Sequence, residues 1–176
     1  PFYFRYSPQV VVRNLTWADL PRFESLFNLP SIIWPIKYYP DGIIGKAGYE
    51  GQFNPFMKRV EDKNIVCRVL QNEKKRIVGM ASLTPLASVA ESHVRILDFI
   101  IHPNYLAHSL ELLKDIQQQA SFIKVNLLRC FVAEDSFQKI DILKKIGFKE
   151  SVNLTEQIKV ERKQRTLCIY SKSLSY

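Results

Sequence analysis

The segment Ile96-Leu97-Asp98-Phe99-Ile100-Ile101-His102-Pro103 decides the fold of this chain. Apart from Asp98 it is apolar up to His102, which is typical of a strand that is covered on both faces. We predict that this strand spans residues 93–102 and ends at Pro103, which has no N–H group to continue a ladder. A sheet with helices on both faces follows from this pattern.

The residues after this strand alternate between helical and strand patterns. An amphipathic helix is predicted from Tyr105 to Ala120, followed by a buried strand over 125–132. A second helix is predicted to begin at Asp135, with Gln138 completing a capping box, and to close at Gly147 in a left-handed cap. The predicted inward residues of the two helices are Leu106, Leu110, Leu113, Ile116 and Ala120, then Phe137, Ile140, Leu143 and Ile146. Residues 148–159 and 164–173 are predicted to form a final hairpin.

The residues before the central strand give a similar order. A short strand is predicted over 9–13, and a helix capped by Thr16 or Asp19 then runs to Pro30. Residues 31–62 form a long aromatic excursion for which we expect some helix. Two strands over 64–70 and 76–83 are predicted to pair as an antiparallel hairpin.

Length and composition favour one domain. The chain has 176 residues, of which 47% are hydrophobic, which is enough for a single core. We expect one domain over residues 9–176, with residues 1–8 a leading segment from a longer polypeptide. No apolar run approaches the roughly 18 residues that a membrane span requires. We therefore expect an intracellular, cytoplasmic or cytoskeletal protein with no membrane span.

Charge and cysteine content limit the classes of partner. The net charge of +8 favours an acidic partner or a polyanionic cofactor. Nucleic acid is disfavoured, because the chain has no zinc-finger spacing, basic heptad region or aromatic RNA-recognition signature. The three cysteines, Cys67, Cys130 and Cys168, lie in apolar segments at wide spacing, so we expect buried thiols with neither a disulfide framework nor a metal site.

The order of elements resembles that of the Gcn5-related N-acetyltransferases (GNATs) over nearly the whole chain. Ile101-His102-Pro103 is similar to the family's apolar-x-Pro at the end of its fourth strand, and residues 143–148 are similar to its helix ending in Gly-Phe. The resemblance implies an acyl-CoA N-acyltransferase-like α/β (α+β) fold. Its sheet is expected to be mixed, mostly antiparallel and of about seven strands, with helices on both faces. It also implies acetyl-CoA or CoA as the cofactor and an amine as the substrate.

The family's phosphate-binding turn is altered in this chain. In the family, a basic or amide residue precedes two small residues that let backbone amides approach the pyrophosphate. Counting from Pro103 puts Leu106 in the first place and Ser109 and Glu111 in the glycine places. A shorter register puts Ala107 and Ser109 there instead. The residues expected near a bound cofactor are Ile100, Ile101, Ala107, His108, Ser109 and Leu110.

The family's acid position is also altered. Leu143 stands where many members carry a Tyr that protonates the departing thiolate, and leucine has no proton to donate. Asp98 and Glu91 are the candidate bases, with His102 and His93 as nearby imidazoles. The competing interpretation of Asp98 is a hydrogen-bonded residue at the point where two strands splay apart. The competing interpretation of His102 is a structural residue.

Two hypotheses follow. The favoured one is a catalytically silent GNAT-like domain that serves as an interaction or scaffold module, with protein partners or other domains of the same polypeptide. The alternative is an acetyl-CoA-dependent N-acyltransferase that acts on an amine, in which the aromatic residues over 34–56 form the substrate wall. The fold favours the second and the altered site favours the first.

Overall fold

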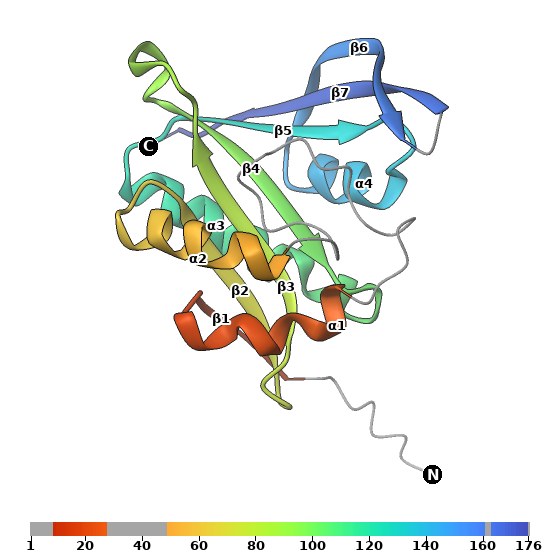
Figure 1. The fold of residues 1–176 in the computed structure, drawn as a ribbon. Coiled ribbons are helices and arrows are strands. Elements are labelled where there is room, and N and C mark those ends of the chain that lie inside the picture. Colours follow the sequence, from red (N-terminus) through yellow and green to blue (C-terminus); the bar gives the residue numbers. More distant parts are fainter. Residues whose placement is uncertain (1–8, 28–48, 161–162, 176) are drawn as a thin grey trace.

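The computed structural model describes residues 9–27, 49–160 and 163–175 (Figure 1). A seven-stranded sheet with the order β1-β2-β3-β4-β5-β7-β6 forms its centre. The strands are β1 (Val10–Asn14), β2 (Val66–Asn72), β3 (Ile77–Pro85), β4 (Val94–Ile101), β5 (Leu127–Ala133), β6 (Lys149–Val160) and β7 (Lys163–Ser173). Each predicted strand is present, and the predicted fold class is confirmed.

The sheet is mixed and mostly antiparallel. Every pair of neighbouring strands is antiparallel except β4 and β5, which run parallel. The helical crossover that a parallel pair requires is supplied by the helix between them. The antiparallel pairs are long, whereas the parallel pair holds only three partners, from Val94↔Leu127 to Ile96↔Arg129.

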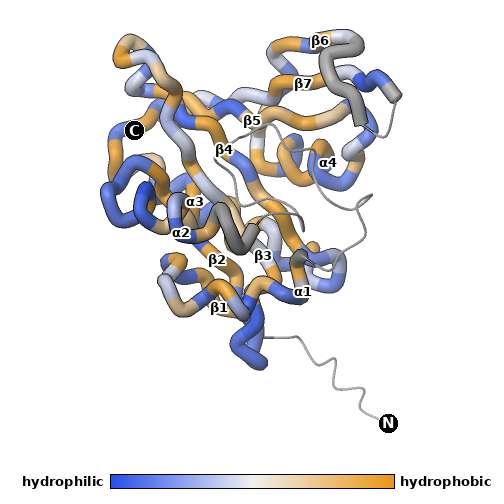
Figure 2. Tube along the Cα trace, viewed as in Figure 1, coloured by the Kyte–Doolittle hydropathy of each residue, from blue (hydrophilic) through white to orange (hydrophobic). Residues whose placement is uncertain are grey.

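Helices cover both faces of the sheet (Figure 1). The α-helices are α1 (Glu24–Phe27), α2 (Tyr49–Glu61), α3 (Ser109–Phe122) and α4 (Phe137–Lys145), and the 3-10 helices are η1 (Trp17–Phe23), η3 (Val89–Glu91) and η4 (Pro103–His108). The helices α3 and α4 pack on one face, and η1, α1 and α2 pack on the other. The two cores account for the run of apolar colour along the inner strands in Figure 2.

Strand β4 contributes to both cores because its side chains alternate between faces. Leu97, Phe99 and Ile101 belong to the core under α3 and α4, and Ile100 belongs to the core under α1 and α2. The near-continuous apolar pattern of the sequence therefore reports burial on two faces, as predicted.

The predicted helix from Tyr105 is wrong in its start and in one part of its inward face. Residues 103–108 form η4, with a non-helical Tyr105 (φ −118°), and the α-helix begins only at Ser109. The later start shifts the buried face. Leu112 is fully buried, whereas Leu110 is 37% exposed.

The predicted start of the next helix is also wrong. Ser136, not Asp135, occupies the N-cap of α4, and the Asp135 carboxylate pairs with Arg165 at 2.8 Å. Phe137 was expected to point inward and is 75% exposed. The predicted end is confirmed, because Gly147 has φ +92° and the next N–H group, that of Phe148, donates to the carbonyl of residue 143.

The first predicted helix is present as η1 followed by α1. Asp19 does more than cap it, since its buried carboxylate accepts from the Thr16 N–H and pairs with Arg13 and Arg22. Its end at Pro30, the leading segment 1–8 and most of the aromatic excursion lie outside the described residues. Helix α2 is the helical part expected of that excursion. No helix in the described ranges is both long and apolar enough to cross a bilayer.

Candidate functional site

The parallel strands β4 and β5 are hydrogen-bonded along only the first part of their length. Their pairing ends at Ile96↔Arg129, although β4 continues to Ile101 and β5 to Ala133. The two strands thus splay apart toward their C-terminal ends. This splay leaves one backbone edge of each strand facing a gap, and Asp98 lies at its beginning.

The hydrogen-bond pattern of β4 shows which groups face the gap. The His102 N–H donates to the Val78 carbonyl on β3 at 2.8 Å. Because donors in an antiparallel strand alternate between its two edges, residues 97, 99 and 101 direct their backbone groups toward β5. In agreement, the Phe99 N–H donates to the Asp98 Oδ1 at 2.9 Å rather than to a strand.

Asp98 is held by a buried ion pair with Lys139 from α4. The Lys139 Nζ lies 2.6 Å from the Asp98 Oδ1, and the two side chains are 8% and 7% exposed. The ammonium also lies 4.8 Å from the centre of the Phe99 ring. Asp98 projects toward the α2 face by the alternation of β4, so Lys139 reaches it from the α4 face through the splay.

The Asp98 carboxylate favours the charged form of Lys139. Burial alone would lower the pKa of Lys139, but the attraction and hydrogen bond of the Asp98 carboxylate outweigh it, and the pKa is raised. Cys130, on β5 just past the last strand pair, is fully buried beside them. Its pKa is raised to about 12, mainly by burial, so its thiol stays protonated. The splay therefore contains a charged pair and a neutral thiol.

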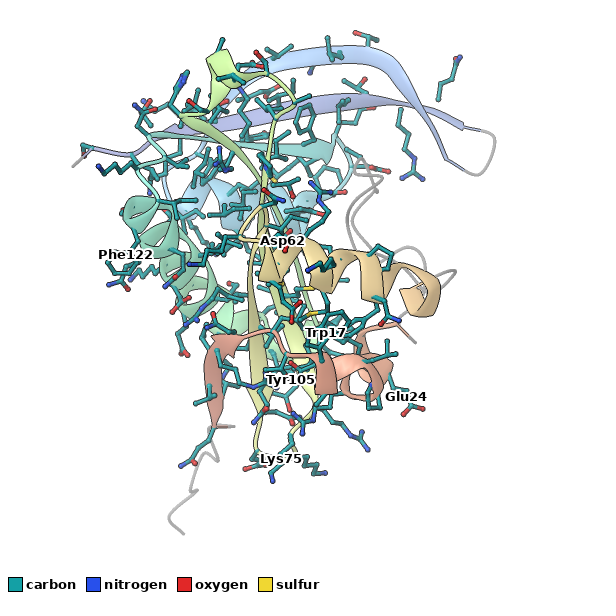
Figure 3. The ribbon with its side chains drawn as sticks, turned by 60° about the vertical axis from the view of Figure 1, so that its left-hand side comes forward. Trp17, Glu24, Asp62, Lys75, Tyr105 and Phe122 are labelled. Atoms are coloured by element: carbon teal, nitrogen blue, oxygen red, sulfur yellow. The ribbon has the colours of Figure 1, made fainter. Side chains whose placement is uncertain are left out.

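The turn between β4 and α3 is built from imidazole and phenol groups. The His102 Nδ1 accepts the N–H of Asn104 at 3.1 Å, which starts η4. The Tyr105 hydroxyl accepts from Asn72 at 3.1 Å, and its ring contacts those of His102 and His108. Figure 3 shows Tyr105 near the end of the sheet where Lys75 marks the β2–β3 turn. These contacts connect the turn to β2 through Asn72.

Solved structures share this architecture. No family model matches the chain, and no curated protein is similar to it in sequence. A GNAT-family acetyltransferase from Streptococcus pneumoniae is similar over 95% of this chain and 100% of its own, with a TM-score of 0.75 and 13% identity. The fold is that of the GNAT acetyltransferases.

Other solved GNAT structures agree with this assignment. The ribosomal-protein-alanine N-acetyltransferase of Brucella melitensis is 20% identical, with a TM-score of 0.75, over 93% of this chain and 99% of its own. A chimeric spermidine N-acetyltransferase that is partly from Vibrio cholerae is 16% identical, with a TM-score of 0.71, over 93% of this chain and 94% of its own. At these identities the likeness establishes the GNAT fold alone.

Two of the groups predicted to lie near the cofactor phosphates already have partners within the chain. Leu106 offers no side-chain donor, and the Ser109 N–H already donates to the Leu106 carbonyl. Glu111 lies in the first turn of α3 and pairs with His108 at 3.0 Å. Its carboxylate lies near the positive end of the helix dipole, where it would repel a phosphate group.

The structure separates the two predicted bases. Asp98 lies buried in the splay, whereas Glu91 lies partly exposed in η3 and its carboxylate is 3.8 Å from Arg129. Leu143, at the position of the GNAT acid, is fully buried in the core. The predicted cofactor-contacting residues are also divided. Ile100 and Ile101 are buried on opposite faces of β4, and Ser109 is buried at the start of α3. Ala107 is exposed and His108 is partly buried in η4, and Leu110 is exposed in the first turn of α3.

The sequence interpretation missed Lys139, the partner that fixes Asp98. One signal was present: Lys139 lies four residues before Leu143, so it belongs to the inward face of α4. A lysine on such a face needs a buried counter-charge. Asp98 is the acidic residue in the apolar central strand, and the two could have been paired on that basis.

Proposed function

We propose that this chain is a non-catalytic GNAT-like module that acts by binding a protein partner or another domain of the same polypeptide. The observation that carries the proposal is the Asp98–Lys139 pair, which occupies the splay with the chain's own side chains. The protein keeps the fold because the two cores do not depend on the site.

The Asp98–Lys139 pair lies in the region where the reaction of a GNAT enzyme would take place. In a GNAT enzyme the cofactor phosphates bind at the turn after β4, and the acid belongs to α4. The thioester must therefore lie between the two, beside the edge of β4 that faces the gap. In this chain the Phe99 N–H on that edge already donates to Asp98, and Lys139 crosses the gap.

Proton transfer in the splay is also disfavoured. To take a proton from an amine, Asp98 would have to give up its charge and leave the Lys139 ammonium buried without a counter-charge. Such a state costs several kcal/mol. Leu143 offers no proton for a leaving thiolate, and Cys130 is a protonated thiol at neutral pH. These groups therefore favour neither deprotonation of the amine nor protonation of the leaving thiolate.

An acetyl-CoA-dependent N-acyltransferase remains the alternative function. Its support is the likeness to solved acetyltransferases, two of which are named for amine substrates, spermidine and the alanine of a ribosomal protein. In that case backbone amides at the start of α3 would hold the cofactor, and water would supply the proton. The net charge of +8 would attract CoA in either case, at least at low salt.

Calorimetric titration of the purified protein with acetyl-CoA and with CoA distinguishes the two functions. The titration is run at low and at physiological salt, with inorganic pyrophosphate as the control for general attraction of anions. We expect no heat and no thermal shift beyond the pyrophosphate control at physiological salt. Micromolar binding that persists there would overturn the proposal and lead to a screen of amine substrates.

A further inference from the structure

The outer edge of β1 is unpaired among the described residues. β1 stands first in the strand order, so only its inner edge pairs, with β2. Edge strands in natural proteins usually carry a bulge, a proline or a free charge that prevents further pairing. The opposite edge strand, β6, has two register shifts of this kind, whereas the register of β1 with β2 is regular throughout.

The side chains of β1 do not protect its outer edge either. Residues 10–12 are three valines, which favour extended structure. Arg13 is the charged residue of the strand, and its guanidinium is bound by Asp19 and by Gln71. The outer edge of β1 can therefore accept a further strand.

The hydrogen bonds of the β2–β3 turn show which backbone groups of β1 face outward. The Asn72 N–H donates to the Arg76 carbonyl and the Asn72 carbonyl accepts from the Lys75 N–H, both at 3.0 Å, so the backbone of Asn72 faces β3. Val10 is the partner of Asn72 on β1. Because the residues of a non-hydrogen-bonded antiparallel pair direct their backbone groups away from each other, Val10 and, by alternation, Val12 face outward. These groups repeat at about 6.8 Å, which an added extended strand can match.

A basic turn lies at one end of this edge. Lys74, Lys75 and Arg76 follow Asn72 closely, their side chains are exposed, and none of them forms an ion pair within the described ranges. The Asn72 Oδ1 accepts from the N–H groups of residues 74 and 76, at 3.1 and 2.9 Å. Figure 3 shows Lys75 at the tip of the hairpin, at the far end of the sheet. Glu73 is the acidic residue of this turn, so the turn has a net charge of +2.

The composition of the edge indicates which partner fits it. β1 has five residues, so pairing with its backbone alone supplies few hydrogen bonds. Acidic side chains that extend past Val10 would meet the cations of the turn, which adds attraction and speeds the encounter. Val11 is 53% exposed and offers an apolar contact to a β-branched residue of the added strand.

A second copy of this chain does not have these properties. In an antiparallel pair of two β1 strands, the residues after Asn14 would lie beside the basic turn, and residues 15–17 carry no negative charge. In a parallel pair the two basic turns would meet and repel each other. The edge therefore favours an acidic segment of another protein or domain.

We propose that the outer edge of β1 pairs with an extended segment of a protein partner, which carries acidic residues at the end that reaches Lys74, Lys75 and Arg76. The inference rests on the proposed function, since it names the surface and the chemistry by which the module binds its partner. The splay takes no part in this contact, so the two regions can be tested separately.

The experiment starts from a displayed library of random nine-residue peptides, selected on the purified protein at physiological salt. We expect the selected peptides to carry β-branched residues and, at one end, two or more acidic residues. The tightest peptide is synthesised, and its affinity is measured by fluorescence anisotropy. Replacing its acidic residues with their amides should weaken binding at least tenfold.

Hydrogen exchange locates the bound peptide. The amides of Val10 and Val12 face outward and should exchange more slowly when the peptide is bound. The amides of Val11 and Arg13 face β2, so their exchange should change little. Slower exchange at β6, or anywhere but β1, would contradict the proposed edge.

Val12→Pro tests the edge with little disturbance of the fold. It removes an outward N–H group, and proline is tolerated in an edge strand when its nitrogen faces solvent. Peptide binding should weaken at least tenfold, and the thermal unfolding midpoint shows whether the variant is folded. A folded variant that binds as tightly as the wild type would overturn the inference.

A charge variant tests the turn and is independent of the proline. Lys74→Gln, Lys75→Asn and Arg76→Gln together remove its cations, and asparagine suits the φ of +58° at position 75. Binding should again weaken at least tenfold.

The matched control removes the same number of exposed charges elsewhere, and its residue 124 also has a positive φ, +57°. It combines Lys114→Gln, Lys124→Asn and Lys144→Gln. This control should bind nearly as the wild type does. An equal loss in the two triple variants would show a general attraction of anions and overturn the inference.

Two further results would also overturn it. One is that no peptide is selected, and the other is that the protein self-associates through an edge that Val12→Pro blocks. Failure of the proposed function is a separate result. If CoA binds at physiological salt without displacing the peptide, the β1 surface stands and the non-catalytic proposal falls.

Discussion

The Lys139 Nζ lies 2.6 Å from the Asp98 Oδ1, and both side chains are less than a tenth exposed. The pair joins α4 to the central strand across the point where β4 and β5 separate. Buried pairs of this kind add little net stability over apolar residues, but breaking one by removing a single partner is costly. Several expected properties of the protein follow from this pair and its surroundings.

Lys139→Met should destabilise the protein by about 3–5 kcal/mol, because it leaves the Asp98 carboxylate buried without its counter-charge. Adding Asp98→Asn to the same chain should recover much of the loss, since the buried charge is then gone and an oxygen still accepts from the Phe99 N–H. Urea unfolding of the wild type, both single variants and the double variant measures the coupling. A single-variant loss below about 1 kcal/mol would show that the pair is solvated.

The pair should also make stability fall at alkaline pH. The pKa of Lys139 is raised in the folded state, because the attraction of Asp98 outweighs the effect of burial. Its contribution is fully present below the ordinary lysine pKa of about 10.4 and is lost as the pH rises through the higher, folded value. The difference in unfolding free energy between the wild type and Lys139→Met should therefore shrink only above about pH 10.4. A difference that shrinks already between pH 7 and 9 would contradict this assignment.

His102 should produce an opposite dependence at acid pH. Its pKa is lowered by burial, and its Nδ1 accepts the Asn104 N–H only when it is unprotonated. Stability is then lost as the pH falls below about 6.5, the ordinary histidine value, toward the lower folded value. His102→Asn keeps an oxygen that can accept from residue 104 and should flatten this part of the curve. Unfolding midpoints from pH 5 to 8 measure it, and equal slopes in the two proteins would contradict the prediction.

Gly147→Ala should destabilise the protein by about 1–2 kcal/mol, because position 147 has φ +92°. Steric contact is not the cause, since an added Cβ would lie 3.5 Å from the nearest atom, in Lys172. Gly147→Asn should cost less, because asparagine adopts positive φ more readily. Gly79→Ala is the contrasting control, where the Cβ would lie 3.1 Å from that of Leu70. Thermal unfolding ranks the three, and an equal cost for Ala and Asn at 147 would exclude a backbone origin.

Leu143→Tyr, which restores the acid of the GNAT enzymes, should destabilise the protein and create no acetyl transfer. Leu143 is fully buried, so the larger ring overpacks the core at a cost of about 1–3 kcal/mol. Release of free thiol from acetyl-CoA in the presence of spermidine measures transfer. Glu111→Gln is the companion variant, which removes the carboxylate from the start of α3 while α3 keeps its packing. Transfer by either variant would favour the enzyme.

The fold could be predicted from the sequence because it depends on hydrophobic period and turn chemistry. The apolar run of residues 96–101 indicated a strand buried on two faces, and Gly147 marked a helix end. The places where the prediction failed depend on side-chain hydrogen bonds. His102 caps a 3-10 helix that begins at Pro103, so α3 starts only at Ser109, and Asp135 pairs with Arg165 instead of capping α4.

The residues of the candidate site depend on the sequence in part and on the tertiary structure in part. The sequence by itself determined the strand that carries Asp98, the absence of glycine from residues 104–111 and the leucine at position 143, because these are properties of single positions. Only the tertiary structure decided that Lys139 closes the splay and that Oδ2 is left without a partner among the described residues. The strands separate after Ile96 and α4 packs over the gap, so two charges 41 residues apart meet in a buried position. Such a meeting depends on how helix and sheet pack, which hydrophobic period alone does not specify.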